Sequence, residues 1–282
     1  MKHNIAVTFE LLFWTAVALM FGFITAPRIL QKQTEQLPVS PLTFVFIVVG
    51  IMLVAAYVWL KLFKKLSSDM LVGVFSGGIG AIMYRAIKAL FPFTTDSATI
   101  DIILALLIIY GCGFGFYYLV KHMQKSWKNT QRWYSLVNLI MVAVIPVVAV
   151  IMSKGIPLWA AMILLFLIAC YDAYAVWKSK HMIELAKTFM KLRILPGIVV
   201  PRKEKDQFAI LGGGDIFFIS FVSASAYATS SFAAIAVLIG GFAAIIYLFL
   251  ASKKKKFYPA IPFILVGIGL GLAIEWAIRV LL

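Results

Sequence analysis

The chain has 282 residues, of which 63% are hydrophobic and only 13% are charged, and its mean hydropathy is +1.00. A soluble domain of this length needs more charge on its surface, so the composition excludes that class and indicates a polytopic membrane protein. The 26 basic residues outnumber the 11 acidic residues, but they cluster at the ends of apolar runs rather than in a basic, aromatic-interleaved module of the kind that binds nucleic acid.

Nine apolar segments are long enough to cross a hydrocarbon core of about 30 Å, which takes roughly 20 helical residues. Most of them are apolar on every side, which predicts helices that span the membrane rather than lie on its surface. We therefore predict an all-α polytopic membrane protein with nine transmembrane helices. The predicted spans are residues 5–26, 41–62, 70–91, 98–120, 133–152, 157–177, 208–227, 231–250 and 259–281.

The distribution of positive charge predicts the orientation of these spans. With nine spans, 20 of the 26 basic residues fall on the side of the N-terminus, and the remaining six fall on the other side. Lys and Arg are enriched in cytoplasmic loops, so the N-terminus is predicted to be cytoplasmic and the C-terminus exterior. With eight or ten spans, the basic residues would not be concentrated on one side in this way.

The spans form two regions of one integral membrane unit. Residues 1–152 contain spans 1 to 5 and are predicted to form an N-terminal bundle, and residues 157–282 contain spans 6 to 9. The longest loop, 178–207, is predicted to be cytoplasmic. Within it, residues 181–192 have an amphipathic pattern that suits a helix on the membrane surface. Residues 195–206 are predicted to be extended or irregular, because two prolines bracket a β-branched run.

Four acidic residues lie inside predicted spans, where a charged carboxylate costs several kcal/mol and is a functional candidate by default. Asp172 and Asp215 lie about five and seven residues from the predicted cytoplasmic ends of spans 6 and 7, which places both roughly 8–10 Å deep. Consecutive spans are usually neighbours, so these two carboxyl groups are predicted to face each other. Glu275 lies one helical turn before Arg279, which indicates an intrahelical ion pair, and Glu10 lies near the cytoplasmic end of span 1.

Two neighbouring carboxyl groups can share one proton and titrate as a pair. One can then act as a general base on a water molecule while the other donates a proton to a carbonyl oxygen, which is aspartic-protease chemistry and uses no metal or cofactor. Gly212, Gly213 and Gly214 remove side chains beside Asp215 and would admit water and an extended substrate. The same acids also suit an ion channel or an ion-coupled transporter, and the residues alone leave both functions open.

Three short motifs resemble those of the presenilins and appear in the same order. YDAYAVW, Tyr171–Trp177, resembles the YD motif; GGGDIFFIS, Gly212–Ser220, resembles the GxGD motif; and PAIP, Pro259–Pro262, resembles the PAL motif. The resemblance implies an intramembrane aspartyl protease with nine spans and a cytoplasmic N-terminus. It extends in architecture over essentially the whole chain and is sharp at these three motifs.

The resemblance also implies roles for individual residues. Asp172 and Asp215 correspond to the catalytic pair of the family. The residues that correspond to its site-shaping positions are Tyr171, Gly212, Gly213, Gly214, Pro259, Ala260 and Ile261. Gly213 stands at the variable position of GxGD, and Ile261 stands where the family has Leu.

Substrate class and location are implied in the same way. Signal peptide peptidases share the motifs in the opposite orientation, so the charge distribution favours transmembrane peptides of type I, with exterior N-termini. The compact chain resembles smaller microbial homologues that work in the bilayer without accessory subunits, and self-association is left open. We expect a multi-pass protein of the plasma membrane of a microbe. An extended segment near 199–209 is predicted to pair with an unwound substrate as a β-strand.

Overall fold

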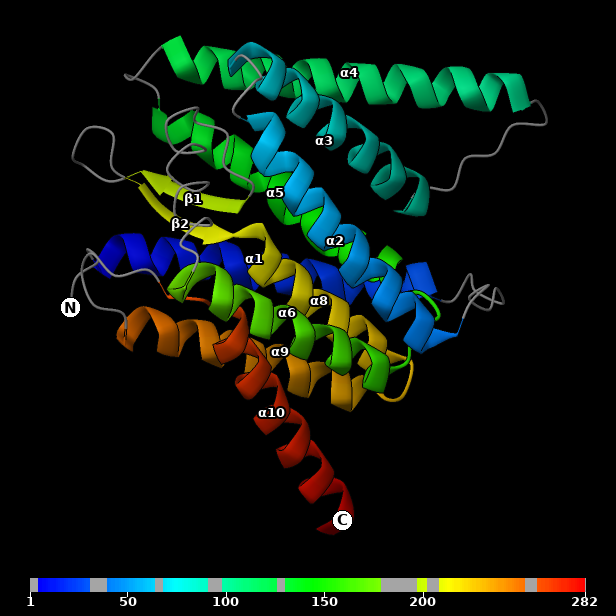
Figure 1. Cartoon of the computed structure of the whole chain (residues 1–282), viewed down its shortest axis with the longest axis vertical. Coiled ribbons are helices and arrows are strands. Elements are labelled where there is room, and N and C mark those ends of the chain that lie inside the picture. The colour runs from blue at the N-terminus through cyan, green and yellow to red at the C-terminus, as the bar shows by residue number, and fades with distance from the viewer. Residues whose placement is uncertain are drawn as a thin grey trace.

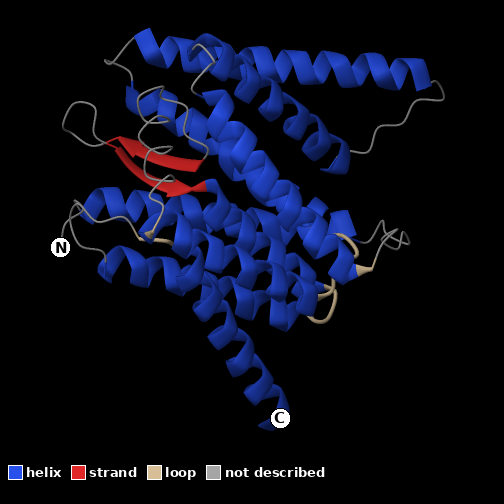
Figure 2. Ribbon diagram, in the orientation of Figure 1, coloured by secondary structure: helices blue, strands red, loops and turns tan. Residues whose placement is uncertain are grey.

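The computed structural model describes residues 5–30, 40–63, 68–90, 98–125, 130–178, 197–201, 208–251 and 258–281. Within these ranges, the chain forms nine α-helices and two β-strands (Figures 1 and 2). The elements are α1 (Ile5–Leu30), α2 (Pro41–Phe63), α3 (Ser68–Leu90), α4 (Ala98–Lys125), α5 (Thr130–Met152), α6 (Leu158–Trp177), β1 (Gly197–Pro201), β2 (Phe208–Gly212), α8 (Gly213–Tyr227), α9 (Ser231–Ala251) and α10 (Ile261–Leu281). The prediction of nine membrane helices is thus matched by nine helices in the described part of the chain. The amphipathic segment 181–192 lies outside it.

Seven of these helices are long and apolar enough to cross a membrane: α1, α3, α4, α5, α6, α9 and α10. In α2, the apolar stretch described in full runs over Pro41–Ile51. Helix α8 has 15 residues, which gives it a length of about 22 Å, short of a hydrocarbon core of about 30 Å. Strand β2 leads directly into α8.

The expectation that span 7 is helical from residue 208 is wrong, because residues 208–212 form a strand. Gly212 has the extended dihedral angles φ −61° and ψ 139°, and the helix begins only after it. β2 pairs antiparallel with β1, with Val199 opposite Ile210. The expectation of extended backbone within 195–206 is confirmed at 197–201. Antiparallel pairing bonds the backbones of the two strands to each other, so these groups do not depend on water for their hydrogen bonds.

Gly197 allows the two strands to approach closely. A Cβ atom at Gly197 would lie 2.2 Å from the carbonyl oxygen of Leu211 and 2.9 Å from the nitrogen of Gly213. Any larger residue at this position would therefore push β1 away from the point where β2 becomes α8.

Helix α8 occupies the centre of the molecule and is buried along almost its whole length. It packs against α1, α5, α6 and α9. The two paired strands β1 and β2, called the hairpin below, lie between α5 and α1 (Figure 1). Ile198 and Val200 of β1 contribute to the same core as α8, whereas Val199 contributes to a second core with residues of α3, α4 and α5. This alternation follows from the two-residue period of a strand, and it places β1 between two layers of helices.

Helix α10 packs closely on α9 through glycine. A Cβ atom at Gly267 would lie 2.3 Å from the carbonyl oxygen of Gly240, and one at Gly271 would lie 2.3 Å from that of Ala236. Small residues at such contacts let helix backbones approach within a membrane.

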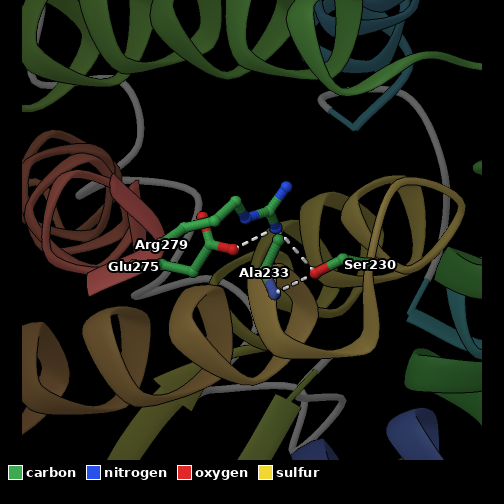
Figure 3. Close-up of polar contacts among 4 residues, drawn as sticks. All are labelled: Ser230, Ala233, Glu275 and Arg279. Atoms are coloured by element: carbon green, nitrogen blue, oxygen red, sulfur yellow. Dashed lines mark hydrogen bonds and ion pairs between the residues drawn. The ribbon is translucent and has the colours of Figure 1, made fainter. Parts of the chain in front are cut away.

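A polar network ties the C-terminal end of α10 to the start of α9 (Figure 3). The hydroxyl oxygen of Ser230 caps α9 by accepting the N–H of Ala233 at 3.0 Å, and it also accepts a hydrogen bond from Arg279 at 3.0 Å. Arg279 forms an ion pair with the buried carboxylate of Glu275, which confirms the intrahelical pair predicted from the spacing.

We expect Arg279→Ala to lower the free energy of unfolding by about 1–3 kcal/mol, because it leaves the Glu275 carboxylate buried without its partner. The double variant Arg279→Ala/Glu275→Leu should recover part of this loss, since no charge then remains buried. Thermal unfolding of the three proteins in detergent measures the difference. Equal losses in the single and double variants would contradict the pairing.

We expect Gly197→Ala to lower the free energy of unfolding by about 1–3 kcal/mol, because the added methyl group overlaps the backbone of β2. Gly214→Ala is the matched control for stability, since a Cβ atom there meets no atom within 4 Å. Thermal unfolding under identical conditions compares the two variants. If both have the stability of the wild type, the close approach at Gly197 is not required.

Candidate active site

Asp215 is the third residue of α8, and its position follows from the way the helix begins. Gly212 is the N-cap residue, and its backbone N–H donates a hydrogen bond to the Asp215 carboxylate. An acidic residue at the third helical position that reaches back to the N-cap N–H forms one half of a capping box. The positive end of the helix dipole also favours a negative charge here. A Cβ atom at Gly212 would lie 3.2 Å from Oδ2 of Asp215, so glycine keeps the space around the carboxylate open.

Asp172 lies in the last turns of α6, and its carboxylate is held by the start of a different helix. Its Oδ2 accepts the N–H of Ile261, the first residue of α10, at 3.3 Å, and Ala260 donates a second backbone hydrogen bond. The flanking residues Pro259 and Pro262 have no backbone N–H. Both N–H groups available in the segment 259–262 are therefore directed at Asp172.

The two carboxylates come from neighbouring helices and act on each other electrostatically. Each is partly exposed, and each is bonded to the N-terminus of a helix: Asp215 to that of α8, and Asp172 to that of α10. Helix N-termini have unpaired N–H groups and a partial positive charge, which makes them suitable sites for anions. This arrangement fixes the orientation of two acidic groups that act on each other.

The other residues singled out from the sequence lie around this pair. Tyr171 is next to Asp172 on α6 and interacts electrostatically with it. Gly213 and Gly214 form the first turn of α8, and Gly214 is exposed. Pro259 is buried immediately before the two residues that bind Asp172. In the described part of the chain, no three His, Cys, Asp or Glu side chains are grouped as a metal site requires.

The two outer edges of the hairpin have different surroundings: the edge of β1 is bonded to α5, and the edge of β2 leads to Asp215. Both the N–H and the C=O of Val199 are bonded to a side chain of α5, so they point away from β2. Val199 and Ile210 are therefore opposed without exchanging hydrogen bonds, and the N–H and C=O of Ile210 point away from β1. Because this pattern alternates, Gly212 points the same way as Ile210, and its N–H binds Asp215. The outer edge of β2 thus runs from Ile210 to Gly212 over about 7 Å, and it ends at the N–H that binds Asp215.

The side chain that binds Val199 is Asn138, a residue that the sequence analysis did not single out. Asn138 is 1% exposed and lies two turns into α5. The sequence does contain a signal for it, since an amide inside an apolar span needs a hydrogen-bonding partner. Its partner, 61 residues away, is supplied by the fold alone.

Solved structures with a similar fold include two of a presenilin family intramembrane aspartate protease. One, in space group C222, is 20% identical, covers 95% of this chain and 99% of its own length, and has a TM-score of 0.62. The other, in space group P2, is 19% identical, covers 95% of this chain and 97% of its own length, and has a TM-score of 0.61. No curated protein sequence matches the chain.

The sequence matches the family described as "Signal-peptide peptidase, presenilin aspartyl protease" over residues 11–279. This match covers nearly the full length, including both aspartates, the hairpin and α10. The chain therefore belongs to the signal-peptide peptidase and presenilin family of aspartyl proteases.

Proposed function

We propose that Asp172 and Asp215 are the catalytic pair of an intramembrane endopeptidase that hydrolyses peptide bonds of transmembrane helices. The observation that carries this proposal is the position of the two carboxylates: they interact with each other, and each is bonded to a helix N-terminus. Membership of an aspartyl protease family supports the reaction class.

The chemistry follows from two carboxyl groups that share one proton. The ionised carboxylate removes a proton from a water molecule as the water oxygen attacks the carbonyl carbon of the substrate. The protonated carboxyl group donates its proton to the carbonyl oxygen, which gives a tetrahedral diol. The carboxyl group that took the proton from water then donates it to the amide nitrogen, and the other carboxylate takes a proton from one hydroxyl group of the diol. The C–N bond breaks, which leaves a new carboxyl and a new amino terminus and returns the pair to its starting state. The backbone hydrogen bonds to Asp172 and Asp215 keep both groups oriented throughout.

An unwound substrate needs partners for its own backbone, and the outer edge of β2 offers them. The expectation of a pairing segment near 199–209 is refined here, because the outer edge of β1 is bonded to Asn138 at Val199. We therefore place the substrate strand on β2, where the N–H and C=O of Ile210 face outward. A substrate strand added there would lie beside Asp215. Its pairing with β2 would therefore place the peptide bond to be cut next to this carboxyl group.

The orientation of the substrate and the location of the enzyme complete the proposal. The excess of basic residues on the N-terminal side supports a cytoplasmic N-terminus. In this orientation the two aspartates lie near the cytoplasmic face and favour type I substrates. We propose that the chain works in the plasma membrane of a microbe, without accessory subunits, as one unit whose spans 6 to 9 form the catalytic region.

We expect Asp172→Asn and Asp215→Asn each to abolish cleavage, because an amide cannot exchange the shared proton. Purified protein is mixed with a tagged single-span type I substrate in detergent or liposomes, and products are followed by mass spectrometry. Thermal unfolding checks that both variants fold. Cleavage that survives both substitutions would place the chemistry elsewhere, and ion flux without cleavage by the wild type would favour the channel or transporter.

We expect Ile210→Pro to reduce cleavage at least about 10-fold, because proline removes the N–H that faces the substrate while the bonds between β1 and β2 remain. Ile210→Ala is the matched control, since it shortens the same side chain and keeps the N–H. Steady-state cleavage of the same substrate measures both variants. Equal activity of the two variants would show that the substrate strand does not pair with this edge of β2.

A further inference from the structure

Asn138 makes a bidentate contact with the backbone of β1. Its Nδ2 donates to the carbonyl oxygen of Val199 at 2.8 Å, and its Oδ1 accepts the N–H of Val199 at 2.9 Å. Asn138 is 1% exposed and Val199 is fully buried. The side chain therefore uses both of its amide functions on one residue of the hairpin, in a region closed to solvent.

The contact reproduces what a neighbouring β-strand would do. In an antiparallel ladder, a hydrogen-bonded residue donates its N–H to one partner residue and accepts from the same residue. The amide of Asn138 supplies this donor and acceptor from the side of α5. Asn138 thus makes the two hydrogen bonds that a residue of a third strand would make, and it occupies the edge of β1 at Val199.

This contact also determines where the hairpin sits. Neighbouring residues of α5, Tyr134, Val137 and Met141, pack in the same core as the side chain of Val199. Apolar packing excludes a slip of β1 by one residue, which would turn Val199 to the other core, and the two directed hydrogen bonds specify which residue of β1 meets Asn138. Val199 opposes Ile210, and Ile210 lies two residues before Gly212, which binds Asp215. A shift of β1 on α5 is therefore transmitted along β2 to the Asp215 carboxylate.

We propose that Asn138 is a positioning residue that sets the register of the substrate strand relative to the two aspartates; this inference rests on the proposed function. By occupying the edge of β1, it leaves the edge of β2 as the place where a substrate strand adds. By holding Val199 at one point on α5, it fixes which peptide bond of that strand reaches Asp215. Asn138 makes no contact with the reacting atoms and acts through the hairpin.

The test compares Asn138→Leu, which keeps the branched shape and removes the amide, with Asn138→Gln, which keeps the amide and moves it outward by one methylene. Leu139→Ala is the matched control, because Leu139 is the next residue of α5 and its side chain is 55% exposed. Each purified protein is given the same single-span type I substrate. Mass spectrometry gives the share of product from each bond, and initial rates give kcat and KM.

We expect both Asn138 variants to cut at bonds adjacent to the principal bond of the wild type, and kcat at the principal bond to fall about 100-fold with a smaller change in KM. Leu139→Ala should keep the wild-type distribution.

A purely structural role would lower the amount of active enzyme without changing the ratio of products, so this ratio separates the two roles even if Asn138→Leu is partly unfolded. An unchanged distribution in both Asn138 variants, beside an active wild type, overturns the inference alone. A wild type that cleaves no substrate overturns the proposed function and the inference together.

Discussion

A backbone N–H or C=O group among membrane helices needs a hydrogen-bonding partner within the protein, and this constraint governs the region around the two aspartates. Strands placed among helices interrupt helical structure, which exposes N–H and C=O groups that cost several kcal/mol each when unpaired. Here β1 bonds to β2, Asn138 bonds to Val199, and the first N–H groups of two helices bond to carboxylates. At the starts of the two helices, the hydrogen bonds that satisfy the backbone N–H groups are therefore the same ones that orient the acidic pair.

The two helix starts are held in place by different means. Helix α8 begins late because Gly212 is extended, and the close approach of β1 at Gly197 keeps that start fixed. Helix α10 is fixed along its length by backbone packing against α9 at Gly267 and at its far end by Arg279. The N–H of Ile261 consequently has a defined place from which to meet Asp172. Packing far from the carboxylates thus contributes to their geometry.

Much of this arrangement could be predicted from local features of the sequence. Long apolar runs predicted the helices, the cost of a buried charge indicated Asp172 and Asp215, and a four-residue spacing predicted the pair of Glu275 with Arg279. The strand at 208–212 could not be predicted, because FAILG continues directly into the apolar residues of α8, and a short apolar run suits a strand or a helix equally. Asn138 was visible as an amide inside a span, but nothing near it in the sequence names its partner.

The sequence by itself determined the membrane class and the helical architecture, and it singled out two acidic residues inside predicted spans. These properties depend on composition and on a constant rise of 1.5 Å per residue, so they can be read locally. Only the tertiary structure decided which N–H groups meet the carboxylates and which edge of the hairpin Asn138 occupies. Those features join residues far apart in the chain, such as Asp172 and Ile261 at a separation of 89 residues, and they exist only once the helices have packed.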